Sequence, residues 1–126
     1  MNVVDSSAWV EYLTDGPNAS QFARAVQATD QLLVPALVVF EVFKKVLQEC
    51  GEQTALEVAA QMMRCRVVDV TATLALEAAR LSVLHRLPMA DALILASARA
   101  HHAVLWTQDA HFEGLPRVEY RRARSR

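Results

Sequence analysis

Four acidic residues spread along the sequence could do chemistry together: Asp5, Glu41, Asp91 and Asp109. Carboxylates that converge on one place repel each other, and without a compensating cation some of them are held protonated. Mg²⁺ prefers oxygen ligands in octahedral geometry, and it keeps several waters beside one or two carboxylates and a substrate phosphate. An ion held in this way activates water and stabilises charge on a phosphodiester, so the four acids indicate metal-assisted hydrolysis.

Three of these acids also have a purely structural interpretation. Asp5 stands at a predicted strand-to-helix turn, where aspartate is often an N-cap, although two serines follow it and can serve the same purpose. Asp109 has a comparable alternative as an Asx-turn residue. Glu41 lies four residues before Lys45 on a polar helical stripe, which predicts an i, i+4 ion pair. The pattern alone leaves both interpretations open for Asp5 and Asp109, and it favours an ordinary surface position for Glu41.

Asp91 is the most informative of the four. Its helical neighbours three, four and seven residues later are Ile94, Leu95 and Ala98, all of them apolar. An acid in the first turn of a helix gains up to about 1 kcal/mol from the helix dipole. An unpaired carboxylate against an apolar face costs several kcal/mol, so Asp91 needs a partner or a cation. We therefore expect a functional role for this residue.

The predicted elements bring the acids to one edge of a sheet. Apolar strands are expected at residues 2–4, 32–34, 66–70, 103–107 and 118–120, and helices at about 36–49, 53–64, 72–85 and 89–101, with two shorter helices near Trp9 and Phe22. Strands without clean alternation, separated by helices, indicate an α/β fold whose parallel sheet is covered on both faces. Ligands in such folds bind outside the carboxyl ends of the strands, and all four acids can reach that edge.

The composition is that of one folded domain. The 126 residues are 53% hydrophobic and 21% charged, which excludes disorder. No apolar run is long enough to span a bilayer, and no signal peptide is expected at the N-terminus. The two cysteines, Cys50 and Cys65, have no CxxC spacing and are expected to be free thiols in a reducing cytoplasm.

Charge is nearly balanced overall but uneven along the chain. The formal net charge of −1 argues against a general nucleic-acid coat protein, which would be basic. Five arginines nevertheless stand in the last ten residues: Arg117, Arg121, Arg122, Arg124 and Arg126. We expect residues 121–126 to form a basic tail, which is either a solvated end or a contact to phosphates.

At these residues the chain resembles the PIN-domain family, and specifically the toxin subunits of bacterial and archaeal toxin–antitoxin pairs of the VapC type. The matching segments are VVDSS at 3–7, VPA at 34–36 leading to Glu41, LPMADALI at 87–94 and LWTQDAHF at 105–112. They occur in family-like order and spacing over nearly the whole chain.

The resemblance implies an α/β/α sandwich around a parallel sheet of four to five strands, with residues 1–126 forming a single PIN domain. It also implies a cytoplasmic endoribonuclease that depends on Mg²⁺ or Mn²⁺, inhibits translation, forms a homodimer and is inhibited by a cognate antitoxin. Asp5 and Asp91 would be the main metal ligands, and Glu41 and Asp109 would complete the acidic cluster. The secondary polar residues that orient the cluster would be Ser6 and Thr107.

Two other functions remain as alternatives. A catalytically silent PIN-like module would bind RNA or a protein, and a substitution at one of the four acids would have favoured it. A phospho-acceptor receiver domain would need paired acids after the first strand, where Asp5 is instead followed by serines. The histidines show no HExxH spacing and are predicted to be structural or surface residues: His85, His101, His102 and His111. Trp9 and Trp106 are predicted to belong to the core.

Overall fold

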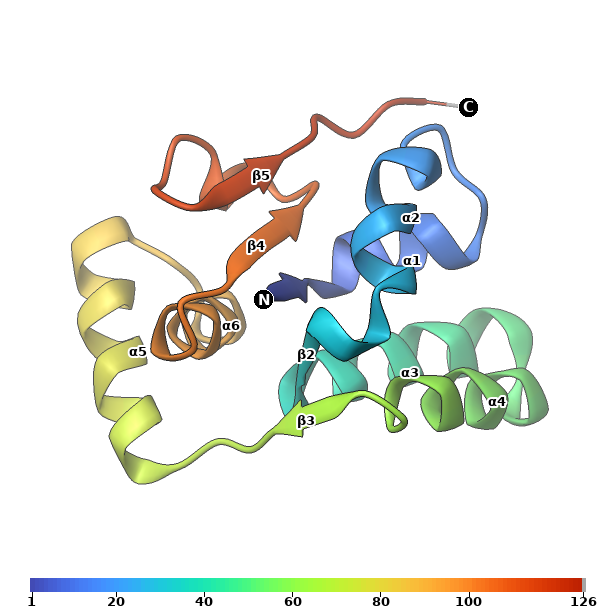
Figure 1. Cartoon of the computed structure of the whole chain (residues 1–126), viewed down its shortest axis with the longest axis horizontal. Coiled ribbons are helices and arrows are strands. Elements are labelled where there is room, and N and C mark those ends of the chain that lie inside the picture. The colour runs from blue at the N-terminus through green and yellow to red at the C-terminus, as the bar shows by residue number, and fades with distance from the viewer. Residues whose placement is uncertain (126) are drawn as a thin grey trace.

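Five parallel strands form a central sheet in the order β3-β2-β1-β4-β5 in the computed structural model, which describes residues 1–125 (Figure 1). The strands are β1 (Asn2–Val4), β2 (Leu32–Pro35), β3 (Arg66–Val68), β4 (Val104–Thr107) and β5 (Val118–Tyr120). The helices are α1 (Ser6–Leu13), α2 (Ala19–Gln27), α3 (Ala36–Cys50), α4 (Glu52–Met62), α5 (Ala72–His85) and α6 (Met89–Ala100), with two 3₁₀ turns, η1 (Thr29–Gln31) and η2 (Ala110–Phe112).

The central strands are buried because both faces of the sheet are covered. Val3 pairs with Leu33 on one side and with Leu105 on the other, and all three side chains are fully buried. Such continuous apolar strands are typical of parallel sheets flanked by helices. The prediction of an α/β sandwich with four to five parallel strands is confirmed.

The chain crosses the sheet in two directions. It passes from β1 to β2 to β3 through α1 to α4, and then returns past those strands to β4 through α5 and α6. Right-handed crossovers in opposite directions place their helices on opposite faces. Figure 1 accordingly shows α5 and α6 apart from α1 to α4. The strand order reverses between β1 and β4, which makes the carboxyl ends of these two strands the expected ligand edge.

A few predicted boundaries differ from the observed ones. The third strand was expected to reach Val70 but ends at Val68, because Val68 pairs with Pro35, the last residue of β2. Asp69 and Val70 are exposed beyond that point.

Gly51 ends α3 as predicted, with a φ of 87°, a left-handed backbone that favours glycine.

The two tryptophans contribute to the packing as predicted, although unequally. Trp9 is buried, whereas Trp106 is partly buried and packs against the core.

No single helix among residues 1–125 combines the length and the apolar character needed to cross a membrane. Helices α5 and α6 meet those criteria only when taken together, across a bend of 115°.

Candidate metal centre

Asp5 is fixed at the carboxyl end of β1 by hydrogen bonds from several directions. Its backbone N–H donates to the carbonyl oxygen of Trp106 (3.1 Å), which continues the β1–β4 pairing. Its Oδ1 accepts from the backbone N–H of Ala8 (3.0 Å) and from Ser7 Oγ (2.7 Å). Its Oδ2 accepts from Thr107 Oγ1 (2.5 Å). Asp5 therefore caps α1, and the effect of Asp109 on its pKa shows that these two acids are close.

The Asp5 carboxyl group is buried and forms no ion pair with any basic side chain among residues 1–125. Its residue exposure is 3%, and its hydrogen-bond partners are two hydroxyls and one backbone amide. Burial raises the pKa of Asp5 from 3.8 to about 6, because desolvation outweighs the hydrogen bonds that lower it, and nearby Asp109 raises it further. A carboxylate in this environment gains from a nearby cation.

Thr107 connects Asp5 to Asp109. The Thr107 hydroxyl is fully buried at the end of β4, where it donates to Asp5 Oδ2 and accepts from the backbone N–H of Asp109 (2.8 Å). The backbone N–H of Gln108 donates to Ser7 Oγ (3.1 Å). The segments that follow β1 and β4 are thus bonded to each other, and the Thr107 hydroxyl links the Asp5 carboxylate to the backbone of Asp109.

Asp91 reaches the same place from the first turn of α6. Its Oδ2 lies 2.8 Å from His111 Nδ1, and its side chain is 15% exposed. Burial raises the pKa of Asp91 to about 6; the hydrogen bond from His111 lowers it, and Asp109 raises it. One side-chain ligand atom from each of Asp91, Asp109 and His111 can be chosen so that all three lie within 4.8 Å of one another.

The sequence assigned no chemical role to His111, yet its ring lies between two of the predicted acids. Asp109 caps η2 by accepting from the backbone N–H of His111 (2.9 Å), and this turn places His111 Nδ1 3.1 Å from Asp109 Oδ1. The hydrogen bond to Asp91 is the main cause of the raised pKa of His111. Local spacing rules failed here because Asp91 lies 20 residues away in the sequence.

Glu41 contacts α1 through one hydrogen bond. Its Oε1 accepts from Ser6 Oγ (3.1 Å) in the first turn of α1, beside Asp5. The predicted ion pair with Lys45 is wrong: Lys45 Nζ instead lies 2.8 Å from Glu49 Oε1, one turn later. Among residues 1–125, the Glu41 side chain is hydrogen-bonded to Ser6, and no hydrogen bond connects it to Asp5, Asp91 or Asp109.

The C-terminal segment runs from β5 past the turn between α1 and α2, to which it is hydrogen-bonded (Figure 1). Asn18, which is 1% exposed, donates through Nδ2 to Gln108 Oε1 (2.6 Å) and to the carbonyl oxygen of Arg122 (2.9 Å). Arg124 donates to Asn18 Oδ1 (3.0 Å) and to the carbonyl oxygen of Pro17 (2.8 Å). Arg126 lies outside the described residues. The basic segment therefore runs along this edge of the molecule, with the Arg122 side chain exposed.

The acidic cluster has a donor set that suits a hard divalent cation. Within residues 1–125, no lysine or arginine forms an ion pair with Asp5, Asp91 or Asp109, and His111 is the one basic side chain that contacts them. Carboxylate oxygens are the ligands that Mg²⁺ and Mn²⁺ prefer. The oxygen donors, and negative charge that only His111 offsets within residues 1–125, both fit such an ion.

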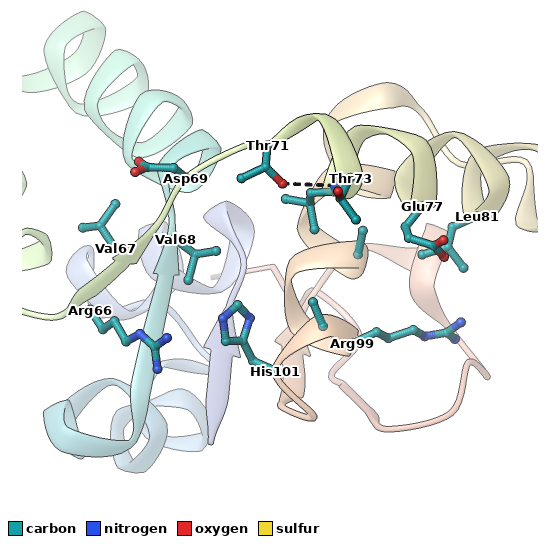
Figure 2. Close-up of a pocket in the computed structure, with 13 residues that line it drawn as sticks. Arg66, Val67, Val68, Asp69, Thr71, Thr73, Glu77, Leu81, Arg99 and His101 are labelled. Atoms are coloured by element: carbon teal, nitrogen blue, oxygen red, sulfur yellow. Dashed lines mark hydrogen bonds between the residues drawn. The ribbon is translucent and has the colours of Figure 1, made fainter.

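A separate cavity of about 600 Å³ lies between β3, α5 and α6 (Figure 2). His101 and Arg99 line it from the C-terminal end of α6, whereas Asp91 stands in the first turn of that helix. Its walls carry both signs of charge, with Arg66 and Arg99 opposed by Asp69 and Glu77. This cavity lacks the converging acids, so the acidic cluster is the candidate site.

Comparison with known proteins gives a family match and a fold match. The sequence matches the PIN domain family over residues 3–118. No curated protein shows significant sequence similarity to the chain.

Solved structures share the fold at low sequence identity. A toxin–antitoxin complex from Klebsiella pneumoniae aligns with a TM-score of 0.79 at 20% identity, covering 94% of this chain and 96% of that one. VapC20 from Mycobacterium tuberculosis, a sarcin–ricin loop cleaving toxin, aligns with a TM-score of 0.75 at 22% identity, covering 92% and 95%. VapBC2 from Rickettsia felis, bound to a promoter DNA fragment, aligns with a TM-score of 0.72 at 15% identity, covering 96% and 97%.

Proposed function

This chain belongs to the PIN domain family, and from that membership we propose that it is an endoribonuclease that depends on Mg²⁺ or Mn²⁺. The observation that carries the proposal is the convergence of Asp91 and Asp109, with Asp109 also close enough to the buried Asp5 to raise its pKa and no lysine or arginine paired to any of them within residues 1–125. Hydrolysis of an RNA phosphodiester is the reaction that such a centre supports best.

Each acid has a distinct part in this proposal. Asp5 and Asp91 would hold the ion, and Asp109 and Glu41 would complete the negative cluster around it. When bound, the ion supplies a Lewis acid for a phosphate oxygen and lowers the pKa of water. The chain itself keeps Asp5 in place through Ser7, Ala8 and Thr107, so that its carboxylate does not have to reorganise when charge develops.

The secondary polar residues position rather than react. Ser6 would orient Glu41 from the first turn of α1, and Thr107 would set the spacing between Asp5 and Asp109. These contacts hold acids from separate segments of the chain at one edge of the sheet. Preorganised charge of this kind is a large contribution to catalysis by metal-assisted hydrolases.

We further propose that the protein is the toxin of a cytoplasmic toxin–antitoxin pair, forms a homodimer and inhibits translation by cleaving RNA. The support is that solved structures with this fold include toxin–antitoxin complexes, some of them bound to DNA, and a toxin that cleaves the sarcin–ricin loop. The cognate antitoxin would be the protein partner that inhibits the site.

Cleavage of RNA by the purified, antitoxin-free chain tests the proposal. Wild type, Asp91→Asn and Asp69→Asn are compared in Mg²⁺, in Mn²⁺ and in EDTA. Asp69 serves as the control because it carries the same side chain as Asp91 but is exposed and lies outside the cluster. We expect metal-dependent cleavage by wild type and by Asp69→Asn, and none by Asp91→Asn. Metal binding without cleavage of any RNA would instead favour a catalytically silent binding module.

A further inference from the structure

We propose that His111 Nδ1 is a ligand of the divalent ion, so that the centre binds through nitrogen as well as oxygen and discriminates in favour of Mn²⁺ over Mg²⁺. This inference rests on the proposed metal centre and adds a specificity-determining residue to it. The sequence predicted His111 to be a structural or surface residue and not a metal ligand. Its ring projects from η2 and lies within hydrogen-bond distance of both acids, of which Asp91 comes from α6.

The spacing of the three donor atoms is the first argument. His111 Nδ1 lies 2.8 Å from Asp91 Oδ2 and 3.1 Å from Asp109 Oδ1. Adjacent ligand atoms around an octahedral ion with bonds of 2.0–2.1 Å are separated by about 3 Å, and opposite ones by about 4.2 Å. The three ligand atoms, all within 4.8 Å of one another, are close to these separations. A cation can therefore enter with small side-chain adjustments.

The second argument is that His111 is held in place by its backbone. Its N–H donates to Asp109 Oδ1 (2.9 Å), and the next residue, Phe112, is fully buried in the core. The N–H of Phe112 donates to the carbonyl oxygen of Asp109 (3.1 Å), which closes the turn. The histidine therefore projects from a short turn anchored on both sides, and its side chain is still 54% exposed and accessible to an entering ion.

The third argument is chemical. In the metal-free protein Nδ1–H donates to Asp91, and metal binding would release this proton to solvent. The resulting neutral tautomer carries its hydrogen on Nε2 and has the Nδ1 lone pair free for a metal. Imidazole nitrogen is a good ligand for transition-metal ions, whereas Mg²⁺ is a hard cation that keeps oxygen ligands and water. A nitrogen ligand added to an otherwise carboxylate site therefore raises the affinity for Mn²⁺ relative to Mg²⁺.

Pulsed electron paramagnetic resonance of the full-length chain loaded with Mn²⁺ tests the assignment directly. A coordinated imidazole gives ¹⁴N modulation of the Mn²⁺ signal, which we expect in wild type and in His101→Ala but not in His111→Ala. His101 is the matched control because it lies at the opposite end of α6 from Asp91. The wild-type spectrum is decisive by itself, should the His111 variant fail to fold.

Metal affinity provides the second readout. We expect His111→Ala to weaken Mn²⁺ binding by about tenfold or more and to leave Mg²⁺ binding within about twofold of wild type. Mn²⁺ that binds in an Asp91-dependent manner without ¹⁴N modulation would overturn the role of His111 and leave the proposed metal centre standing. Absence of Mn²⁺ binding that depends on Asp91 would overturn both. Stronger binding of both ions by His111→Ala would show that the imidazole competes with the metal, which also contradicts the assignment.

Discussion

At the residue scale, the structure shows how one side chain serves two purposes. Asp5 caps α1 through Ala8 and is also the most deeply buried acid of the cluster. An exposed carboxylate can also cap a helix, so capping alone does not require Asp5 to be buried. Burial beside Asp109 works against the charged form and is the feature that a capping role leaves unexplained. The proposed cation would explain it.

The raised pKa values predict that the metal-free protein loses stability as pH rises. Asp5 and Asp91 have folded-state pKa values of about 6, above the ordinary 3.8, so the folded state binds more protons between these two pH values. The stability that Asp5 and Asp91 contribute is fully present below pH 3.8 and is lost as pH rises through 6. Because the pKa of His111 is also raised, the contribution of His111 to the stability of the folded state also falls as pH rises.

Denaturant unfolding in EDTA at pH 4.5 and pH 7.5 measures this effect. We expect the free energy of unfolding to be lower at pH 7.5, with a contribution on the order of 2 kcal/mol from Asp5. Asp91→Asn should reduce the difference in the free energy of unfolding between pH 4.5 and pH 7.5. Greater stability at pH 7.5 than at pH 4.5 would contradict the raised pKa values.

A second prediction at this scale concerns the Thr107 hydroxyl. Thr107→Val keeps the shape of the side chain, but it leaves the backbone N–H of Asp109 without its acceptor and Asp5 Oδ2 without its donor. We expect a loss of about 1–3 kcal/mol in the free energy of unfolding, together with weaker metal binding. Thr107→Ser, which keeps the hydroxyl, is the control, and equal stability of the two variants would disprove the bridging role.

At the element scale, much of the fold was predictable because local pattern and long-range packing agree. The apolar runs of β1, β2 and β4 are central strands, and Gly51 ends α3 as expected. The end of β3 was not predictable from its own residues, since it is set by the last partner in β2, Pro35. Strand length depends on a neighbour that the apolar pattern of β3 does not reveal.

The candidate site, like the fold, was only partly predictable from the sequence. The positions of Asp5, Asp91 and Asp109 follow from strand ends and helix starts, which the sequence pattern reveals. The partners of Glu41 and His111 do not. Helical spacing favoured Lys45 for Glu41, whereas the packing of α3 against α1 supplies Ser6. The contact between His111 and Asp91 exists only because η2 and the first turn of α6 meet at the sheet edge.

The α1–α3 contact predicts a specific difference between two glutamates of the same helix. Glu41→Gln keeps an acceptor for Ser6 but removes a negative charge from the cluster, so we expect slower metal-dependent cleavage with the fold retained. Glu49→Gln breaks only the exposed pair with Lys45, so it should cost at most about 0.5 kcal/mol and leave cleavage unchanged. Both are checked by RNA cleavage rates and thermal unfolding. Equal cleavage rates for the two variants would remove Glu41 from the site.

At the scale of the whole molecule, the buried Asn18 connects segments that are far apart in the sequence. It bonds the α1–α2 turn to Gln108 beside Asp109 and to the C-terminal segment at Arg122 and Arg124. The basic residues are thereby held along the edge that carries the acids. This arrangement would let an RNA backbone contact positive charge while its phosphodiester meets the cluster.

Removal of the residues after Tyr120 tests this arrangement. We expect weaker RNA binding and a smaller dependence of affinity on salt concentration, because fewer counterions are released when fewer arginines contact phosphates. Asn18→Ala is the comparison, since it frees the segment but retains its charge, and it should keep more of the salt dependence. An unchanged salt slope in the truncated protein would show that the segment does not contact RNA.

The central claim is that the acidic cluster binds a divalent cation, and calorimetric titration of Mg²⁺ and Mn²⁺ into the purified chain tests it without any knowledge of the RNA substrate. We predict saturable binding to wild type and to Asp69→Asn, and its loss in Asp5→Asn and Asp91→Asn. At a metal concentration of one hundred times Kd, binding should stabilise wild type by about 2.7 kcal/mol. Equal binding to wild type and to Asp91→Asn would contradict the account, because the cluster would then not be where the ion is held.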